Sequence, residues 1–160
     1  METESGHQVI TSSGHQPQDL EQRIREQFPQ AVDEVALTVD FPTLTVSREQ
    51  FLAVCRFAKE QLGFDSPQNV NGIDRLTHLE VVYHVYSMQE WRFLGLKVKV
   101  DRDDPHMPSA TGIWRGVNWH EREVFDMFGV IFDDHPDLRR ILLPDDWEGH
   151  PMRKDYKEID

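Results

Sequence analysis

Cysteine is almost absent from this sequence, since Cys55 is the only one among 160 residues. A single cysteine allows no disulfide bond within the chain. It also excludes an iron–sulfur cluster held by the thiolates of this chain alone, because such clusters take several cysteine ligands. Cys55 lies on the apolar stripe of a predicted helix, which favours a buried structural thiol over a catalytic nucleophile.

Long apolar runs and an excess of positive charge are missing too. No stretch is long enough to cross a bilayer, and residues 1–16 lack the pattern of a signal peptide. The formal net charge of −12 argues against nucleic acid as a partner and against direct binding to an anionic membrane surface. We therefore expect a cytoplasmic protein that reaches a membrane only through other proteins.

Motifs that bind nucleotides or activate a serine are absent as well. The chain has no G-x-G-x-x-G and no G-x-x-x-x-G-K-[ST], so we expect no nicotinamide or flavin dinucleotide to bind by the usual route. It also has no G-x-S-x-G elbow, with which many hydrolases present a nucleophilic serine.

Apolar periodicity predicts two helices in the first part of the chain. One covers residues 17–28, carries apolar side chains at i,i+4 spacing and is ended by Pro29. The other follows Ser47, a predicted N-cap, and ends at Gly63. The apolar stripe of the second helix consists of Phe51, Val54, Cys55, Ala58 and Leu62.

β-Branched and aromatic residues predict five strands. They are residues 35–39, 44–46, 70–73, 79–86 and 93–101. A turn at 40–43 joins the first two into a hairpin, and the turn signals Ser66-Pro67 and Asn71-Gly72 make the third strand short or bulged. Apolar and charged residues alternate along 93–101, so the sheet buries one face and exposes the other.

The order of these elements predicts the α+β class, because helices and strands do not alternate one to one. We expect an α-β-β-α-β-β-β two-layer mixed sheet with the helices on one face, followed by a short helix and a long irregular C-terminal tail. The chain then divides into a mobile N-terminal arm (1–16), an α+β domain (17–128) and an extended tail for subunit contacts (129–160).

The last quarter of the sequence carries the most information. Asn118 is a predicted helix N-cap, with Glu121 completing a capping box, and Gly129 is a natural stop. Arg122 and Asp126 have the i,i+4 spacing of an ion pair. Beyond the helix neither a helical nor a strand period persists, yet many apolar and aromatic side chains remain. We expect this segment to lie against its own domain or a neighbouring subunit.

This segment resembles the signature of the C subunit of respiratory complex I, the NADH-quinone oxidoreductase. The resemblance rests on Glu121-Arg122-Glu123, Asp126, His135, Arg139 and Ile141-Leu142, and continues through Trp147, Gly149 and Arg153-Lys154-Asp155-Tyr156. It runs without a gap, and the rest of the chain fits the family by the order of its elements.

The resemblance implies a structural subunit of the peripheral arm, on the cytoplasmic side of the cell membrane, with no cofactor of its own. That complex is a proton translocase of the respiratory chain, which passes electrons from NADH through FMN and iron–sulfur centres in other subunits to quinone. The implied partners are the large hydrogenase-like subunit and the cluster-bearing subunits. An alternative is the equivalent subunit of a ferredoxin-dependent or membrane-bound hydrogenase-type complex.

We expect the functional residues to form a partner interface and not a catalytic, metal or cofactor site. The predicted interface residues are Glu121, Arg122, Glu123, Asp126, His135, Asp137, Arg139, Arg140, Trp147, Arg153, Lys154, Asp155 and Tyr156. The pairs Arg139-Arg140 and Arg153-Lys154 are plausible anchors for an acidic partner, because arginine favours bidentate contacts with carboxylates. Pairing with aspartates of the same chain explains these residues nearly as well.

Acid–base chemistry is a weaker explanation for the carboxylates of the predicted helix. Glu121 and Glu123 point about 200° apart at 3.6 residues per turn, so they cannot act together on one substrate. Ion pairs with the arginines of the same segment explain these carboxylates better.

Metal and quinone binding are two further alternatives. A small metal-dependent hydrolase would use His120, Glu123 and His135, although no spacing matches a zinc motif such as H-E-x-x-H. The tryptophans and Tyr156 could stack a quinone ring, but aromatic residues at this density more often anchor interfaces.

Overall fold

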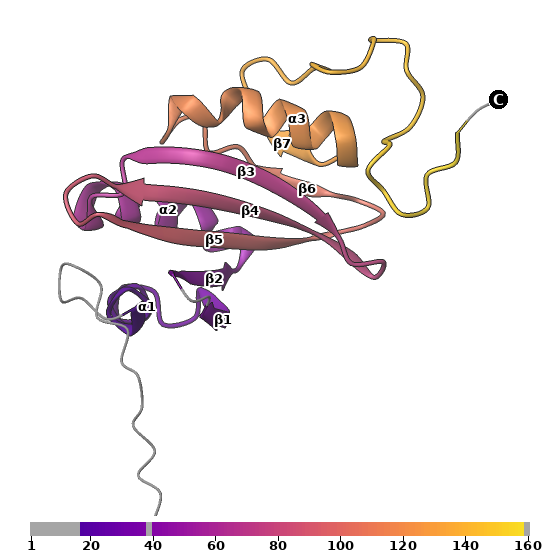
Figure 1. The fold of residues 1–160 in the computed structure, drawn as a ribbon. Helices are drawn as coiled ribbons and strands as arrows, with labels where there is room; N and C mark the ends of the chain where they lie inside the picture. The colour runs from indigo at the N-terminus through magenta and orange to yellow at the C-terminus, as the bar shows by residue number, and fades with distance from the viewer. Residues whose placement is uncertain (1–16, 38–39, 159–160) are drawn as a thin grey trace, which may run out of the picture.

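The protein folds around a five-stranded sheet in the spatial order β1-β2-β5-β4-β3. The computed structural model describes residues 17–37 and 40–158. The strands of this sheet are β1 (Val32–Leu37), β2 (Pro42–Val46), β3 (Ser66–Asp74), β4 (His78–Ser87) and β5 (Arg92–Asp101). β2 and β5 run parallel and the other neighbours run antiparallel, so the sheet is mixed, as predicted (Figure 1).

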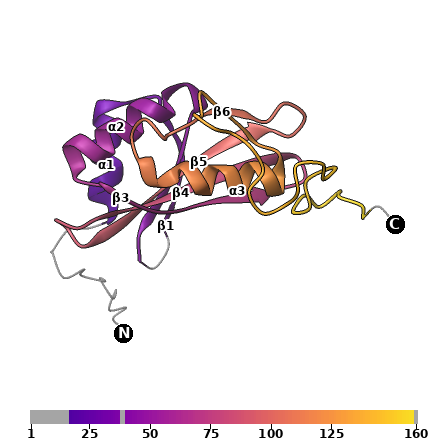
Figure 2. The same cartoon turned by 90° about the horizontal axis from the view of Figure 1, so that it is seen from above.

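Three α-helices cover one face of this sheet. They are α1 (Pro17–Gln27), α2 (Phe51–Leu62) and α3 (Asn118–Phe128). The Tyr83 ring of β4 lies 5.0 Å from the Phe51 ring of α2, and the Tyr83 hydroxyl donates to Glu121 of α3. Phe28, just after α1, meets Phe57 of α2 edge to face. Figure 2 shows α1 beside α2, with α3 farther along the sheet.

The core lies between these helices and alternate residues of the two central strands. The buried positions are Leu79, Val81, Tyr83 and Val85 of β4 and Leu94, Leu96, Val98 and Val100 of β5. The intervening positions carry charged pairs such as Glu80 with Lys97, 3.4 Å apart. This alternation confirms the predicted α+β sheet with one apolar and one polar face.

The helix ends are confirmed at the C-terminal side and wrong at the N-terminal side. Gly63 and Gly129 end α2 and α3 in the left-handed conformation, with φ of 76° and 79°. Neither Ser47 nor Asn118 makes a side-chain cap. The short 3-10 turns η1 (Arg48–Gln50) and η2 (Arg115–Val117) lead into the two helices. Their i→i+3 backbone hydrogen bonds take the place of a capping side chain.

The N-terminal hairpin is confirmed with shifted bounds. Val32 pairs with Val46 and Leu37 with Pro42, so the first strand begins earlier than predicted and the second begins inside the predicted turn. Residues 38–39, which the prediction placed in the first strand, lie outside the described residues, as does the predicted arm at 1–16.

The turn predictions at Ser66-Pro67 and Asn71-Gly72 are wrong, because both pairs lie within β3. β3 is an edge strand with a bulge between Pro67 and Asn69, a place where a strand tolerates proline. Gly72 serves packing, since a Cβ atom there would lie 2.4 Å from Cδ2 of Phe128 on α3. The third strand is therefore long and bulged, not short.

A second, two-stranded sheet was not predicted. It pairs β6 (His106–Pro108) in parallel with β7 (Ile131–Asp133). Each strand has three residues, too few to show a period of two. The expectation that no strand follows Gly129 is corrected by β7.

Candidate functional site

The chain after β7 runs back along α3 and past the end of the main sheet without regular secondary structure (Figure 1). We call residues 134–158 the tail segment. Charged side chains hold much of its backbone in place. Two of them, Glu121 and Asp126, project from α3, and both are fully buried.

Glu121 anchors the first turns of α3 to the core. Its Oε1 accepts hydrogen bonds from the Tyr83 hydroxyl (2.7 Å) and the Ala110 backbone N–H (2.8 Å). Its Oε2 accepts one from the Ser109 hydroxyl at 2.6 Å. The predicted capping box is therefore wrong, because the carboxylate points into the core and not back to Asn118.

Burial dominates the electrostatics around Glu121. It raises the pKa of this carboxyl group, and the hydrogen bonds from Ser109, Ala110 and Tyr83 oppose that shift. Burial and the nearby Glu121 charge also raise the pKa values of the Tyr83 hydroxyl and the Cys55 thiol well above their usual ranges. Cys55 is therefore an inert, buried thiol, as predicted.

Asp126 and Arg140 tie the tail segment to the other end of α3. Arg140 Nη1 lies 2.7 Å from Asp126 Oδ1, and Asp126 Oδ2 accepts from the backbone N–H groups of Ile141, Leu142 and Leu143. The predicted pairing of Arg122 with Asp126 is wrong, because an arginine from the tail segment takes that place.

Arg140 also joins separate parts of the backbone. Its Nη1 donates to the Asp126 carbonyl (3.1 Å), and its Nη2 donates to the carbonyls of Trp147 (2.9 Å) and Gly149 (2.8 Å). Burial alone would raise the pKa of Asp126, but the hydrogen bonds from Arg140 and the three backbone N–H groups outweigh it and lower the pKa. Asp126 is therefore ionised, and we call this arrangement the Asp126–Arg140 clamp.

Arg122 and His135 hold the part of the tail segment between the two carboxylates. Arg122 donates from Nε and Nη2 to the carbonyls of Arg139 and Arg140, both at 3.2 Å. The Asp137 N–H donates to His135 Nδ1, so the His135 proton is on Nε2, which donates to the Asn118 carbonyl.

A second group of charges holds the far end of the tail segment. Arg153 Nε donates to the Phe128 carbonyl at 2.6 Å. Asp74, at the end of β3, forms an ion pair with Arg102 and accepts a hydrogen bond from the Lys154 N–H at 2.8 Å. Arg102 also reaches Asp155 at 3.0 Å. The hydrogen bond from Arg102 is the main reason that the pKa of Asp74 lies well below its usual range.

The structure sorts the predicted interface residues into two groups. Glu121, Arg122 and Asp126 are buried, and the side chains of His135 and Arg140 are 0% and 11% exposed. The exposed members are Glu123, Asp137, Arg139, Trp147, Lys154 and Asp155, while Arg153 and Tyr156 are half-buried. The Arg139 side chain pairs with the neighbouring Asp137, at 2.9 Å.

The structure does not assemble the residues of the alternative metal site. His135 uses both ring nitrogens in hydrogen bonds to the backbone. Within residues 17–37 and 40–158, no group of three or more His, Cys, Asp and Glu side chains is placed to hold a metal ion.

Several residues of this site were not identified from the sequence. Tyr83 and Ser109 complete the surroundings of Glu121, and Asp74 and Arg102 hold the end of the tail segment. Their partners lie 12 to 80 residues away in the chain, so local spacing carries no signal for them. A tyrosine at an inward position of a predicted strand was the one available hint, since a buried hydroxyl needs a partner.

Apolar side chains of α3 and the tail segment face outward. Trp119, Leu142, Met152 and Trp147 are 65%, 61%, 56% and 42% exposed. Leu142 and Met152 line a groove of 250 Å³ between α3, β3 and the tail segment, together with Met127, Phe128 and Glu123. Such outward apolar side chains mark an interaction surface.

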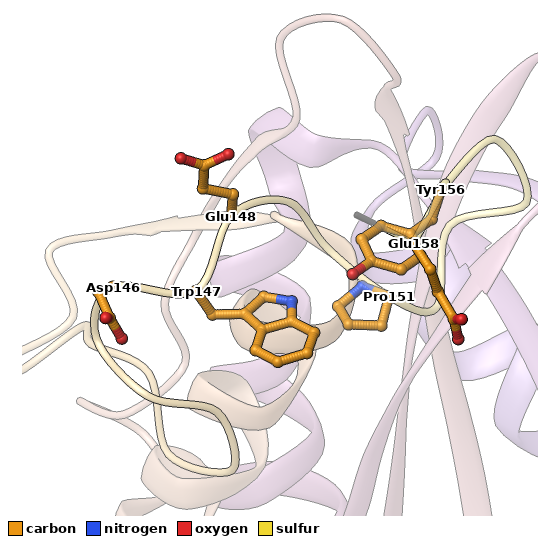
Figure 3. A pocket seen from close by; sticks show the side chains of 6 residues that line it. All are labelled: Asp146, Trp147, Glu148, Pro151, Tyr156 and Glu158. Atoms are coloured by element: carbon orange, nitrogen blue, oxygen red, sulfur yellow. The ribbon is translucent and has the colours of Figure 1, made fainter. Parts of the chain in front are cut away.

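A larger pocket of 580 Å³ opens within the tail segment. It is lined by Asp146, Trp147, Glu148, Pro151, Tyr156 and Glu158. Figure 3 shows the Trp147 and Tyr156 rings on either side of Pro151, with the three carboxylates around them.

None of the helices in the described part of the chain combines the length and apolar character needed to span a bilayer. The family model described as "Respiratory-chain NADH dehydrogenase, 30 Kd subunit" matches residues 44–159. In structure, the chain is similar to a trypsin-resistant fragment of Nqo5, with 27% identity and a TM-score of 0.65 over 76% of this chain and 98% of the fragment.

Curated relatives have the same family name. The C subunit of the NADH-quinone oxidoreductase of Roseiflexus sp. (strain RS-1) is 45% identical over 84% of this chain and 80% of the relative. That of Salinispora arenicola (strain CNS-205) is 42% identical over 81% of this chain, but the match spans only 55% of the relative's length. These matches confirm the resemblance seen at residues 121–156, and the chain belongs to the family of the 30 kDa subunit of respiratory-chain NADH dehydrogenase, also called the C subunit of NADH-quinone oxidoreductase.

Proposed function

We propose that this chain is a structural subunit that helps to assemble the peripheral arm of a proton-translocating NADH:quinone oxidoreductase. In this proposal the chain itself is not catalytic and holds no cofactor. FMN, the iron–sulfur centres and quinone bind to other subunits, and the chain keeps those subunits in position. Family membership supports the complex, and the sequence supports the lack of a cluster, because Cys55 is the only cysteine.

The observation that carries the proposal is the preformed surface of α3 and the tail segment. The Asp126–Arg140 clamp and the contacts of Arg153 hold an irregular segment against its own domain. That arrangement leaves Leu142 and Met152 exposed beside an apolar groove. A partner that covered this surface would bury apolar area without first having to order the segment, which lowers the entropic cost of binding.

The proposed partners are the large hydrogenase-like subunit and the cluster-bearing subunits of the peripheral arm. The proposed location is the cytoplasmic side of the cell membrane, reached through these partners. The exposed members of the predicted interface, such as Glu123, Arg139 and Lys154, would form the polar rim around the apolar groove.

Co-purification tests the proposal. An affinity tag at the N-terminus is suitable, because α1 lies far from the tail segment in Figure 1. Host membranes would be solubilised in mild detergent, and the proteins that accompany the tagged chain would be identified. We expect hydrogenase-like and iron–sulfur subunits together with NADH:quinone activity. A tagged chain that purifies alone would contradict the proposal.

A matched pair of double variants tests the surface itself. Leu142→Asp with Met152→Asp places charge in the groove and should release the chain from the complex. Leu76→Asp with Met88→Asp is the control, since these residues are 62% and 56% exposed at the turns on either side of β4. Equal recovery of the complex with both variants would rule out the groove as an interface.

The same preparation distinguishes the remaining alternative. Activity with reduced ferredoxin and none with NADH would assign the chain to a ferredoxin-dependent or hydrogenase-type complex. The electron donor binds to other subunits in either case, so the geometry of this chain does not favour one donor over the other.

A further inference from the structure

The pocket of the tail segment differs in chemistry from the apolar groove on α3. Two aromatic rings and Pro151 form its walls, and its other lining residues are Asp146, Glu148 and Glu158. Its lining therefore contains carboxylates but neither lysine nor arginine. Within residues 17–37 and 40–158, these three carboxylates make no ion pair or hydrogen bond. The pocket is thus an aromatic cavity with unneutralised negative charge at its rim.

The walls of this pocket are held in place by contacts outside it. Arg140 binds the carbonyl of Trp147, and the Trp147 N–H donates to the Pro144 carbonyl. The Tyr156 N–H donates to the Arg153 carbonyl, and its ring packs over Gly149, where an added Cβ would lie 3.0 Å from Tyr156 Cε2. The two rings therefore stay apart without a ligand between them, as Figure 3 shows.

We infer that this pocket receives the guanidinium group of an arginine from a partner subunit. The inference rests on the proposed function, because it assumes a protein partner. Aromatic faces attract cations through their quadrupoles, and tryptophan does so best. A planar guanidinium also stacks on such rings and offers N–H donors to surrounding carboxylates. Arginine is enriched at protein interfaces, where lysine is depleted.

Other occupants fit this chemistry less well. An anionic group would meet three carboxylates. A neutral quinone would leave those charges without partners in a closed interface, which is costly. A compact lysine ammonium carries strongly bound water and lacks the planar face that stacks on tryptophan.

The complex provides the first experiment. The charge-removing triple variant Asp146→Asn, Glu148→Gln, Glu158→Gln keeps the shape of the pocket. The control triple variant Asp33→Asn, Glu60→Gln, Asp65→Asn removes the same charge from exposed positions elsewhere. The complex is washed with increasing salt, and the retained fraction of the tagged chain is measured. We expect the pocket variant to bind about tenfold more weakly, and the control to match the wild type.

The isolated full-length chain provides the second experiment. Arginine amide is titrated against it while the indole N–H signal of Trp147, assigned with Trp147→Phe, is followed by NMR. We expect a saturable shift that is lost in the pocket triple variant and weaker with lysine amide. A tighter response to tetramethylammonium than to arginine amide would indicate a lipid headgroup and overturn the inference.

These results separate the inference from the proposed function. If the wild type co-purifies with its partners and the two triple variants are retained equally, only the arginine pocket is overturned. If the wild type purifies alone but its Trp147 signal responds to arginine amide, the proposed function fails and a guanidinium site remains supported. If neither result is positive, both fail.

Discussion

Replacing Arg140 with methionine should destabilise the isolated protein strongly, although Arg140 was predicted to contact a partner. The change keeps most of the side-chain length but removes the cation that faces Asp126, which is fully buried. It also leaves the carbonyls of Trp147 and Gly149 without their donor. Arg139→Met is the matched control, since the Arg139 side chain is 65% exposed and pairs with Asp137, which is exposed too.

The magnitude follows from the burial of the pair. Breaking a buried ion pair from one side costs about 3–5 kcal/mol, because the remaining charge is uncompensated. Asp126 keeps three backbone N–H donors, so we expect the lower end, about 3 kcal/mol. In a domain of this size that corresponds to a melting temperature lower by about 6–12 °C. Arg139→Met removes an exposed pair and should cost less than about 1 kcal/mol.

Urea unfolding of the isolated chain, followed by circular dichroism, measures both variants. Adding Asp126→Asn to Arg140→Met should recover part of the loss, because the uncompensated buried charge is then gone. The double-mutant cycle isolates the coupling between the two residues. If Arg140→Met were no more destabilising than Arg139→Met, the Asp126–Arg140 clamp would not support the fold, and the reasoning would be refuted.

Three further predictions concern Glu121, Gly72 and acid stability. Glu121→Gln should change the free energy of unfolding by less than about 1 kcal/mol, while Glu121→Leu leaves three buried donors without an acceptor and should cost about 3 kcal/mol or more; equal urea midpoints would contradict this. Gly72→Ala should cost about 1–3 kcal/mol because its Cβ meets the Phe128 ring, and Phe128→Leu in the same chain should relieve part of that cost; a lack of any coupling would argue against this contact. The pKa values of Asp126 and Asp74 are lowered in the folded state, so their stabilisation is present above the unfolded pKa and is lost as the pH falls below about 4. Urea midpoints at pH 7, 4 and 3 should show this loss, and Asp126→Asn should have a shallower pH dependence than the wild type.

Local periodicity was enough to predict the class of the fold. The stripe of α2 and the alternation along β5 each report a single buried face, which residues close in sequence determine together. β6 and β7 were missed because each is three residues long and its partner lies 25 residues away. The turn signal at Gly72 misled for a related reason: what requires a glycine there is Phe128, on a helix far along the chain.

The charged residues show the same limit more sharply. On a helix, spacing alone pairs Arg122 with Asp126, but the structure gives Asp126 an arginine 14 residues away and turns Arg122 toward the backbone of the tail segment. Whether a charge faces inward or outward depends on where the tail segment folds back. That path has no periodic signal, so Arg139 and Arg140 look alike in the sequence, although it is the Arg140 side chain that reaches a buried carboxylate.

The tail segment replaces secondary structure with charged side chains that bind backbone groups. Asp126 accepts from the amides of Leu142 and Leu143, and Asp74 accepts from that of Lys154. Polar backbone groups held this way need no partner protein, so the segment should be ordered in the isolated chain. Hydrogen exchange tests this directly, because local opening exposes each amide to solvent.

The amides of Leu142 and Leu143 should exchange about 100-fold more slowly than those of Asp146 and Glu148, which have no acceptor in the described structure. The factor follows from an opening cost of about 3 kcal/mol for the Asp126–Arg140 clamp, at tenfold per 1.4 kcal/mol. Arg140→Met should remove most of this protection while Arg139→Met retains it. If all four amides exchanged equally fast in the isolated wild type, the tail segment would become ordered only on binding, and the partner would have to compensate for the entropy that this structure assigns to folding.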